Sequence, residues 1–523
     1  MVQTTVDVLI IGAGPTGTTL ALELAAQNIP FRLVDKALER SDRSRALAVQ
    51  SRTLEVLNRH APVQDLTDSG SQVAGGVYYI HGKQVADLDL SNVRTGDDTA
   101  FPQTLNISQS DTEQFLDRCL AEKYGRSAEF GVEAASIVQD ADGVTVTLRN
   151  VAGNGNTEKE DAEEVVRAKY VVGADGAHSL VRHAAQSITF DGSAYPQDFI
   201  LCDAHLRDSR LPRDRLAVCW GDGLMTVFPL RDGMVRVVAS RPGHHADDAD
   251  EPVLADFQAW FDRMAPGSGE LHDPFWMARF RLHHRVASGY REGRLFLAGD
   301  AAHIHSPAGA FLDSYNAERR PVGERLLRSS DRLFSIVASN SWLFRVVRNL
   351  LAPWLLPLLY RDEARRNSIF RFLSQLGVRY RRSAIVGTAA GFSDGAPVRG
   401  GDRAPDGMVG ESETGKQKRL HQLLAPASHH LLLFSGVAVG GQASEADLAR
   451  AEALFRKRDV DAALVHTLVS GTSGARSGYA DANGALHKRF GMEKTAGYAY
   501  IRPDGYIAHI GPLSSLEEFM DWQ

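Results

Sequence analysis

Residues 6–36 read V-D-V-L-I-I-G-A-G-P-T-G-T-T-L-A-L-E-L-A-A-Q-N-I-P-F-R-L-V-D-K, and this stretch decides the fold. Residues 6–11 form a mostly apolar run rich in β-branched residues, which is typical of a strand buried on both faces. Apolar residues at helical spacing over 16–27 predict a helix after it. A second short strand is expected over 31–34, and Asp35 ends it.

Gly12, Gly14 and Gly17 have G-x-G-x-x-G spacing between this strand and this helix. In a dinucleotide-binding unit the first glycine allows a tight turn, the second lets the backbone approach a pyrophosphate, and the third lets helix and strand pack closely. The N–H groups at the helix start would face the phosphates. Asp35 can bind ribose hydroxyls and argues against a 2′-phosphate, so FAD or NAD is expected rather than NADP. The alternative is a plain βαβ unit with glycines that only serve turns.

Composition limits the other possibilities. The 523 residues predict about two to four domains, and the net charge of −7 gives no indication of nucleic acid binding. Cys119, Cys202 and Cys219 have no metal-ligand or C-x-x-C spacing, so an intracellular, cytoplasmic location is expected. Because the first strand starts almost at once, no cleavable signal peptide is expected.

A long apolar stretch covers 333–360 and is interrupted by Arg345, Arg348, Pro353 and Pro357. A membrane-spanning helix needs about 20 mostly apolar residues. We therefore expect no membrane span but a helix that packs on the body of the protein or on a partner subunit, which leaves a homodimer open. A peripheral contact with a membrane also stays open.

Three arginines, Arg43, Arg45 and Arg52, follow the second strand. Arginine forks match phosphate oxygens, so Arg45 is expected to recognise phosphate. Arg52 is interpreted instead as part of a solvated, basic helix start.

Two later strand ends carry an acid, Asp175 and Asp300, in a turn of small residues. Ligands bind at the carboxyl ends of strands in open α/β sheets, so Asp175 is expected to face the same cofactor as Gly12. A turn and helix cap is an adequate alternative for Asp175. His303 and His305 have no partner set, so no metal is expected.

The periodicities predict an α/β protein with an inserted antiparallel sheet and a separate small C-terminal α/β domain. A helix is expected after residue 108, with Ser110 or Asp111 as its cap. Residues 73–90 form a predicted hairpin that is a candidate to join the inserted sheet. The expected boundaries are 1–180 for the first part of the dinucleotide-binding domain, 181–289 for the inserted sheet, 290–393 for the second part with its helices, and 394–523 for the C-terminal domain.

Three motifs stand in order along the chain: G-A-G-P-T-G at 12–17, D-G-A-H-S at 175–179 and G-D-A-A-H-I-H-S-P at 299–307. Together they resemble the flavin-dependent aromatic hydroxylases, the group of para-hydroxybenzoate hydroxylase and phenol hydroxylase. The resemblance covers nearly the whole chain, including the closing Y-I-R-P-D-G-Y-I-A at 500–508. It implies a Rossmann-type FAD-binding domain, an inserted antiparallel β-sheet substrate domain and a C-terminal thioredoxin-like domain.

The resemblance also implies roles at the matching positions. The glycine loop would hold the FAD pyrophosphate, and the end of the second strand would hold the adenosine ribose. The later motifs would contact the ribityl chain and the flavin ring. No catalytic residue is identified. The implied cofactor-binding residues are Gly12, Gly14, Pro15, Thr16, Gly17, Asp35, Lys36, Arg45, Gln109, Asp175, Gly176, Gly299, Asp300 and Pro307.

The activity that the resemblance implies is hydroxylation of a phenolic or polyketide-derived aromatic substrate. NADPH would reduce FAD, and molecular oxygen would form the C4a-hydroperoxide that attacks the ring. No second G-x-G-x-x-G motif is present, which agrees with a group that has no separate NADPH domain. Residues 394–523 contain no cysteine, so a thioredoxin-like domain there would be structural rather than redox-active.

One departure from the family pattern follows Pro307. The family continues with a glycine loop and a long helix whose N-terminus faces the flavin, whereas here Gly309 leads directly into A-F-L-D-S-Y at 310–315. This departure leaves an inactive protein with an FAD-binding fold as one alternative to ring hydroxylation. A second alternative is Baeyer–Villiger oxygenation on the same scaffold, because the motifs do not distinguish the two reactions.

Overall fold

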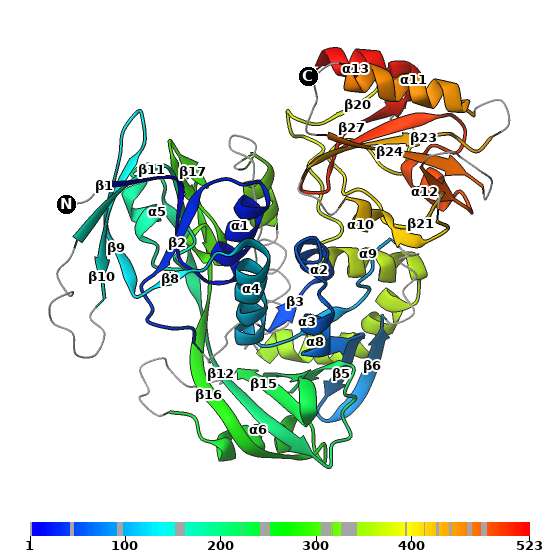
Figure 1. The fold of residues 1–523 in the computed structure, drawn as a ribbon. Helices are drawn as coiled ribbons and strands as arrows, with labels where there is room; N and C mark the ends of the chain where they lie inside the picture. Colours follow the sequence, from blue (N-terminus) through cyan, green and yellow to red (C-terminus); the bar gives the residue numbers. More distant parts are fainter. Residues whose placement is uncertain are drawn as a thin grey trace. The chain divides into compact units, whose positions relative to one another are not determined.

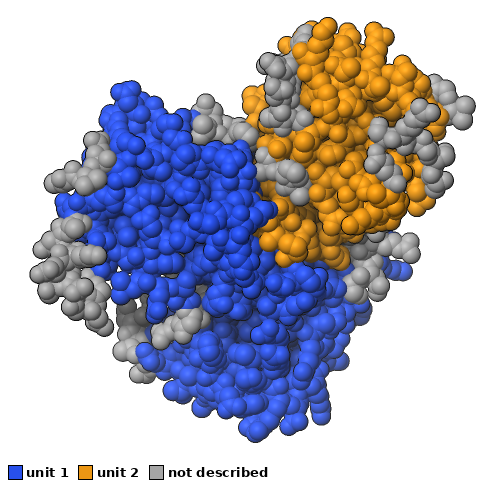
Figure 2. Space-filling model, in the orientation of Figure 1, with its two compact units in different colours: residues 1–50, 63–93, 103–370 blue, residues 51–62, 94–102, 371–523 orange. Residues whose placement is uncertain are grey.

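The computed structural model describes residues 3–522 in two compact units (Figures 1 and 2). Unit 1 comprises residues 1–50, 63–93 and 103–370, and unit 2 comprises 51–62, 94–102 and 371–523. Unit 2 thus starts before residue 394 and includes two N-terminal segments. The residues that are not described are 42–46, 91–97, 152–162, 222, 241–250, 305–314, 316, 326–341, 393–394, 413, 425–427, 439–441, 458–462 and 472–477.

A largely parallel sheet forms the first layer of unit 1. Strands β18, β11, β1, β2 and β8 pair in parallel, and the β9–β10 hairpin pairs with β11 antiparallel. The helices are α1 (Pro15–Ala26), α3 (Gln64–Asp68), α4 (Gln109–Tyr124) and α5 (Leu180–Ala184). The strands are β17 (Arg291–Glu292), β18 (Leu295–Leu297), β11 (Glu163–Gly173), β1 (Gln3–Ile11), β2 (Phe31–Asp35), β8 (Glu129–Phe130), β9 (Val132–Gln139) and β10 (Val144–Asn150).

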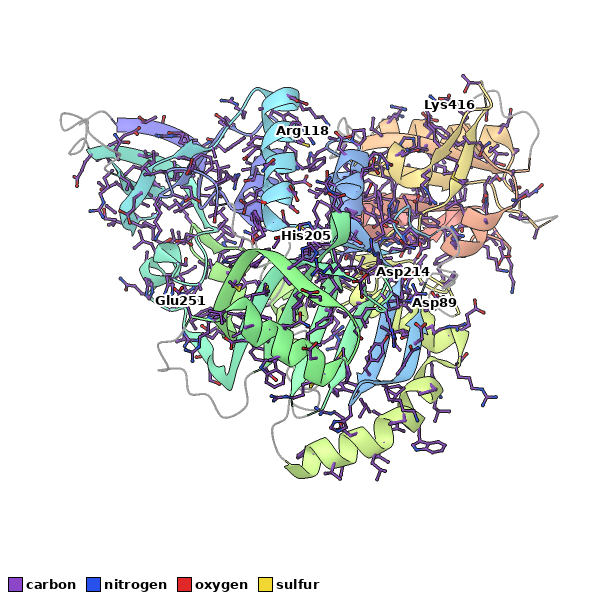
Figure 3. The ribbon with its side chains drawn as sticks, turned by 90° about the horizontal axis from the view of Figure 1, so that it is seen from below. Asp89, Arg118, His205, Asp214, Glu251 and Lys416 are labelled. Carbon is purple, nitrogen blue, oxygen red and sulfur yellow. The ribbon has the colours of Figure 1, made fainter. Side chains whose placement is uncertain are left out.

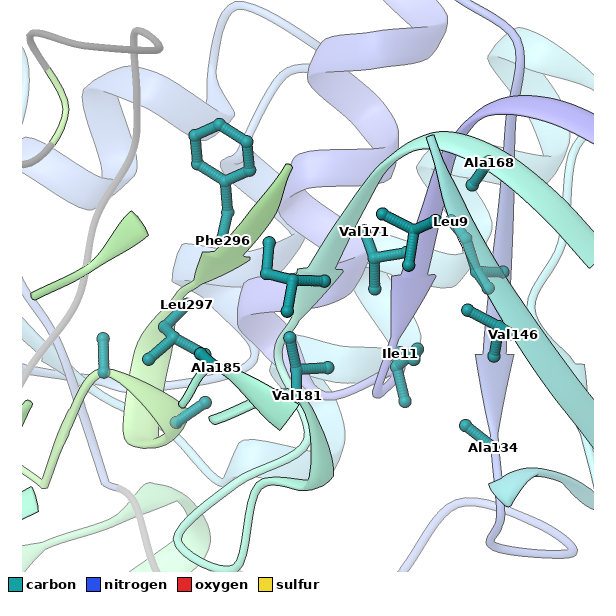
Figure 4. Packing of buried hydrophobic residues seen from close by; sticks show 14 of the residues in the cluster. Leu9, Ile11, Ala134, Val146, Ala168, Val171, Val181, Ala185, Phe296 and Leu297 are labelled. Carbon is teal, nitrogen blue, oxygen red and sulfur yellow. The ribbon is translucent and has the colours of Figure 1, made fainter. Parts of the chain in front are cut away.

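The core of this layer explains the apolar strand at the start of the sequence. Leu9 is fully buried, and it belongs to one cluster with Val146, Val171 and Leu297 from three other strands (Figure 4). Val181 of α5 closes the cluster from a helix. Full burial of one such side chain contributes about 1.5–3 kcal/mol, so a strand with inward apolar residues is held in place by its neighbours. The predicted β–α–β order over residues 6–35 is confirmed.

A second, eight-stranded sheet forms the other layer of unit 1, and α6 (Leu254–Met264) packs on one of its faces. Its pairs are antiparallel except β13–β5, which is parallel because the β5–β6 hairpin reaches the sheet from a distant N-terminal segment. The strands in order are β19 (His303–Ile304), β16 (Glu270–Ala287), β12 (Phe190–Arg207), β15 (Met234–Ser240), β14 (Leu224–Pro229), β13 (Leu216–Trp220), β5 (Gly75–Ile80) and β6 (Lys83–Asp89).

Unit 1 also contains a three-stranded sheet and two long C-terminal helices. The small sheet has the order β3 (Ala48–Val49), β7 (Thr104–Asn106) and β4 (Ser71–Val73). The helices are α8 (Trp342–Tyr360) and the larger part of α9 (Glu363–Leu373). Among the described residues no helix combines the length and hydropathy that crossing a membrane requires.

Unit 2 is built on a mixed eight-stranded sheet with a core on each face. Leu432 and Phe434 of β23 point to one core, and Leu431 and Leu433 point to the other. Its helices are α2 (Ser51–Leu57), α10 (Leu420–Leu423), α11 (Glu445–Arg456), α12 (Ala485–Phe490) and α13 (Leu516–Trp522). The strands in order are β20 (Gly387–Thr388), β27 (Ile507–Pro512), β26 (Gly497–Ile501), β23 (His429–Phe434), β24 (Ala463–Ser470), β25 (Tyr479–Asp481), β21 (Met408–Glu411) and β22 (Gln417–Arg419).

A buried ion network joins the N-terminal segments of unit 2 to its C-terminal part. The Nε of Arg403 donates to Glu55 at 2.8 Å, and its Nη1 donates to Asp98 at 3.1 Å. Arg371 donates to the other oxygen of Asp98 at 2.6 Å. The Arg403 side chain is only 2% exposed, so each of its hydrogen bonds replaces hydration that burial removes. This network holds 51–62 and the segment that begins at Asp98 in place.

Arg52 also belongs to unit 2, and its interpretation as a solvated residue is wrong. Its Nη1 donates to Glu55 at 3.0 Å, and its Nη2 donates to the carbonyl oxygen of Asp504. The guanidinium lies 5.3 Å from the centre of the Tyr506 ring. An arginine in the first turn of a helix gives no sequence signal for a partner more than 400 positions away.

Loss of the central arginine should destabilise unit 2. Arg403→Leu leaves two buried carboxylates without their main partner, and we expect a loss of about 3–5 kcal/mol in its unfolding free energy. Denaturant unfolding followed by fluorescence measures it. The matched control is Arg456→Leu, which removes an exposed helix pair with Glu452 and should cost less than about 0.5 kcal/mol. Equal effects of the two variants would contradict the role of the network.

The same network should make unit 2 sensitive to acid. Burial alone would raise the pKa of the Glu55 and Asp98 carboxyls, but the Arg403 guanidinium reverses this and holds both pKa values below their usual range. The unfolded chain takes up these protons near pH 4, whereas the folded chain resists them. Stability should therefore be fully present above about pH 5 and fall as the pH is lowered further. Unfolding measured between pH 7 and pH 3 should show a shallower slope for Glu55→Gln, and an unchanged slope would refute this assignment.

Candidate functional site

The sequence motifs meet at the carboxyl ends of adjacent parallel strands in unit 1. The backbone N–H of Gly12 donates to Val34 at the end of β2 at 2.8 Å, and that of Ala174 donates to Ile11 at 2.7 Å. The N–H of Ala298 donates to Gly173 at 2.9 Å. The turns after β1, β11 and β18 are therefore neighbours, although nearly 300 residues separate the first from the last.

The glycine loop is crowded at two positions and open at the third. A Cβ atom on Gly12, whose φ is +105°, would lie 2.2 Å from the carbonyl oxygen of Ala174. A Cβ on Gly17 would lie 1.9 Å from the carbonyl oxygen of Gly12, whereas one on Gly14 would meet no atom within 4 Å. Gly14 is also the N-cap of α1, and no side chain caps its N–H groups. The loop thus offers open space at a positive helix end, which suits a phosphate group.

Asp35 is tied to this loop. Its Oδ2 accepts a hydrogen bond from the backbone N–H of Ala13 at 2.7 Å, and its Oδ1 accepts one from Ala37 at 2.9 Å. A carboxylate oxygen can accept two hydrogen bonds, so each oxygen can also bind a hydroxyl group. Lys36 beside it is exposed.

Arg40 is a residue of this site that the sequence analysis missed. Its Nη1 donates to the carbonyl oxygen of Ala13, and its Nη2 donates to Thr18 at 3.1 Å. It also pairs with Asp117 at 2.6 Å and with Glu113 at 3.3 Å, both on α4. Arg40 therefore fixes α4 against the glycine loop. The only indication of this role in the sequence is that Arg40 belongs to a basic segment after the second strand.

Gln109 lies at the start of α4 and joins this network. Its Nε2 donates to Glu113 at 2.8 Å, so a chain of polar contacts leads from Gln109 to the loop through Arg40. The expected cap of this helix was wrong. The N-cap is Ser108, whose hydroxyl accepts the N–H of Asp111 at 3.0 Å, because the helix begins two or three residues earlier than expected.

Asp175 has a structural partner and an unused oxygen. Its Oδ2 accepts the N–H groups of Leu180 at 2.7 Å and Val181 at 3.3 Å, which caps α5. Its Oδ1 is buried without a hydrogen-bond partner among the described residues. Burial raises the pKa of this carboxyl. The N-cap of α5 is Ser179, whose hydroxyl accepts the N–H of Arg182 at 3.0 Å. Asp175 adds to this cap, in agreement with the alternative interpretation, and leaves one polar atom unsatisfied. Gly176 follows it with φ +78°.

The turn after β18 packs against the glycine loop. A Cβ on Gly299 would lie 2.7 Å from Oγ1 of Thr16, so the two motifs are in contact. Asp300 follows in a short 3-10 turn and is exposed. His303 is buried, and its Nδ1 lies 2.9 Å from the hydroxyl of Tyr290. In the described part of the chain no group of His, Cys, Asp and Glu residues has the arrangement of a metal site.

Arg45, Pro307 and His305 lie outside the described residues, as do residues 310–314 after Gly309. Their expected roles stay predictions.

A serine, a histidine and an aspartate are arranged in series in unit 2. The Nδ1 of His487 lies 2.8 Å from Asp481, and its Nε2 lies 3.3 Å from the hydroxyl of Ser435. These side chains could form a nucleophilic triad by distance alone. All three residues are at most 4% exposed, and the Ser435 hydroxyl also accepts the N–H of Ser470 at 3.0 Å. We interpret the arrangement as a buried polar network that joins β23, β24, β25 and α12.

Comparison with known proteins agrees with this site. The family described as "FAD binding domain" matches residues 5–311, which is more than half of the chain. The 6-methylpretetramide 4-monooxygenase of Streptomyces rimosus is 31% identical over 550 aligned positions, covering 97% of this chain and 91% of the relative. The chain belongs to the family of FAD-dependent aromatic hydroxylases.

Two further proteins resemble this hydroxylase over nearly its full length. The pentachlorophenol 4-monooxygenase of Sphingobium chlorophenolicum is 26% identical and covers 96% of this chain and 93% of its own. The crystal structure of the flavin-dependent monooxygenase PieE, in complex with FAD and substrate, covers 99% of this chain and 98% of its own with a TM-score of 0.77. At its 21% identity the likeness to PieE concerns the fold. The mixed α/β fold of the hydroxylase is thus that of FAD-dependent monooxygenases.

The glycine loop should tolerate a side chain at one position only. Gly17→Ala forces the loop carbonyl away from α1, and we expect a loss of about 1–3 kcal/mol in the unfolding free energy of unit 1. Gly14→Ala meets open space and costs only the poorer N-cap, on the order of 0.5–1 kcal/mol. Thermal and denaturant unfolding of the two variants, made without added cofactor, provides the comparison. A larger loss for Gly14→Ala would contradict the packing described here.

Proposed function

We propose that the protein is an FAD- and NADPH-dependent monooxygenase that hydroxylates a phenolic or polyketide-derived aromatic substrate with molecular oxygen. The observation that carries this proposal is the convergence of the glycine loop, Asp175 and Asp300 at one edge of the sheet in a member of the hydroxylase family. Bound FAD would supply the oxygen-activating chemistry, which the side chains of a protein lack.

The described residues fit FAD. The open space at Gly14 and the uncapped start of α1, which includes Pro15 and Thr16, accommodate a pyrophosphate. Asp35 keeps hydrogen-bonding capacity for a ribose. The unsatisfied Oδ1 of Asp175 supplies an acceptor for a cofactor group. Asp300 is exposed, and its neighbour Gly299 packs against Thr16 of the glycine loop. We therefore assign Asp300 to the ribityl chain of FAD.

A wall for the substrate is available on the second sheet. Residues such as Ile200 and Cys202 face α6, so the alternating residues Phe199 and Asp203 point to the opposite face. There Arg236 forms a bidentate ion pair with Asp203, with both hydrogen bonds at 2.7 Å. Phe199, Asp203 and Arg236 are at most 6% exposed, so we assign them to the support of a substrate wall rather than to direct contact with the ring.

The substrate class rests on the relatives. Their names refer to 6-methylpretetramide and to pentachlorophenol, which supports an aromatic substrate and favours ring hydroxylation over the Baeyer–Villiger alternative. We also propose that unit 2 contains a thioredoxin-like domain, supported by its mixed central strands β24, β23, β26 and β27 with α11 and α13. The chain has only three cysteines, all outside residues 394–523, so this domain cannot reduce disulfides.

The test combines flavin content with activity. The purified protein should contain FAD in a stoichiometric amount and oxidise NADPH faster when a phenolic or tetracyclic aromatic compound is added. Asp300→Ala should remain folded by circular dichroism but lose at least nine tenths of its flavin, because a ribityl contact is removed. Asp142→Ala, which changes an exposed acid of the β9–β10 turn, is the control and should retain flavin. Full flavin in Asp300→Ala would refute the role of this residue, and a protein that never binds FAD would refute the proposed function.

A further inference from the structure

Strand β16 presents aromatic side chains on the face of the second sheet that points away from α6. Met277 packs on the α6 side of this sheet. Because side chains alternate along a strand, its neighbours Trp276 and Ala278 point to the other face, and so does Phe280. All three residues are half-buried, so each keeps surface that a ligand can contact.

A small residue between two large ones forms a trough on this face. Trp276 and Phe280 are four positions apart, which corresponds to about 14 Å along an antiparallel strand. Ala278 between them carries only a methyl group, yet it is partly exposed, so the space above it is open. We call these three residues the β16 trough. A single phenol ring fills less than half of this length, whereas several fused rings span it.

Each aromatic ring of the β16 trough contacts a buried side chain of another strand. The guanidinium of Arg236 lies 5.7 Å from the centre of the Trp276 ring, and two hydrogen bonds of 2.7 Å to Asp203 fix it. The ring centre of Phe280 lies 5.8 Å from that of Phe199, which is 2% exposed. Rings that are already held lose little conformational freedom when a ligand stacks on them. The trough is therefore preorganised for a flat ligand.

Beyond Trp276 the same face ends in polar side chains. His205 of β12, which is labelled in Figure 3, stacks on His272 of β16 with ring centres 5.5 Å apart. The Nδ1 of His272 lies 2.8 Å from Asp273, and the side chain of His272 is 32% exposed. Pockets for small ligands combine apolar walls with a few polar groups that fix orientation. This polar end suits the hydroxyl groups of a phenolic compound.

Strand β16 also leads from the β16 trough to the candidate cofactor site. Val286 of this strand pairs with His303, which follows the turn of Gly299 and Asp300. Phe280 lies six positions before Val286, which is about 20 Å along the strand. One strand thus joins the trough to the turn that we assign to the ribityl chain of FAD.

We infer that the β16 trough binds the substrate by stacking and selects fused-ring phenols over single-ring phenols. The inference rests on the proposed hydroxylase function, which leaves the number of rings in the substrate open. Trp276 and Phe280 contact the outer rings, and the methyl group of Ala278 leaves room for the rings between them. Each additional ring buries more apolar area and adds a stacking contact, so affinity rises with the length of the ring system.

Binding of three phenols of increasing length tests the inference. Phenol, 2-naphthol and 2-hydroxyanthracene are titrated into the purified protein, supplied with FAD, in a calorimeter. The affinity of the wild type should rise at least about tenfold from phenol to 2-hydroxyanthracene. Ala278→Leu places a branched side chain in the middle of the trough, so it should lower the affinity for 2-hydroxyanthracene at least about tenfold and that for phenol less than about twofold. The matched control Phe275→Ala removes a 67% exposed ring of the same strand and should bind all three like the wild type.

A second comparison does not depend on filling the trough. Trp276→Ala removes a stacking ring and should lower the affinity for 2-hydroxyanthracene at least about tenfold, whereas Trp276→Phe keeps a ring and should stay within about threefold of the wild type. Circular dichroism establishes that each variant is folded. The inference is overturned by a wild type that binds phenol as tightly as 2-hydroxyanthracene or binds neither. It is also overturned if Ala278→Leu weakens both compounds equally, or if Trp276→Ala binds like the wild type.

The binding measurements can fail independently of the proposed function. If the variants bind as expected but no aromatic compound stimulates NADPH oxidation, the trough is confirmed as a binding site and the oxygenase function is refuted. If an aromatic compound stimulates NADPH oxidation while the trough variants bind it like the wild type, the oxygenase function stands and the trough is refuted.

Discussion

One steric constraint sets the path of the chain through the site: the turn after β1 passes so close to the end of β11 and to α1 that positions 12 and 17 hold no side chain. This contact fixes where α1 begins and aims its N-terminus at the sheet edge. It also brings the loop beside Gly299, so that acids from two distant strand ends share its surroundings. The open position at Gly14 is a consequence, because the loop is held by its first and last glycines and the middle one projects outwards.

Arg403 plays a comparable role in unit 2, but by charge rather than by contact distance. Its partners Glu55 and Asp98 lie 348 and 305 positions earlier in the chain. Burying these groups is costly, and only the complete set of hydrogen bonds offsets that cost. The network is therefore stable in one arrangement of the N-terminal segments only, because any other arrangement would leave a buried charge without its partner. It explains why residues 51–62 belong to unit 2 although they follow the glycine loop so closely in sequence.

The sequence predicted those parts of the site that depend on local rules. A buried strand, three spaced glycines and a helix must follow one another, and an acid at a strand end is visible in a single segment; these elements lie where they were expected. Long-range partners were not predictable in this way. Arg40 binds the glycine loop and α4 at once, and the parallel β13–β5 pair unites segments more than 130 positions apart. The cap at Ser108 was missed because three neighbouring polar residues have nearly equal capping propensity, and packing of α4 decides among them.

Asp175 shows that a structural and a functional interpretation of one residue need not exclude each other. A carboxylate has two oxygens, and in this turn only Oδ2 is used by the N-terminus of α5. The cap fixes the rotation of the group, so Oδ1 is held in one direction at low entropic cost to any ligand that binds it. Ser435 gives the opposite case, because its hydroxyl is satisfied by its neighbours and sealed from solvent. Asp175 and Ser435 differ in whether a buried polar atom still lacks a hydrogen-bond partner. A buried acceptor without a partner lowers the stability of the protein, and a bound hydroxyl or amide group from a cofactor would restore that stability.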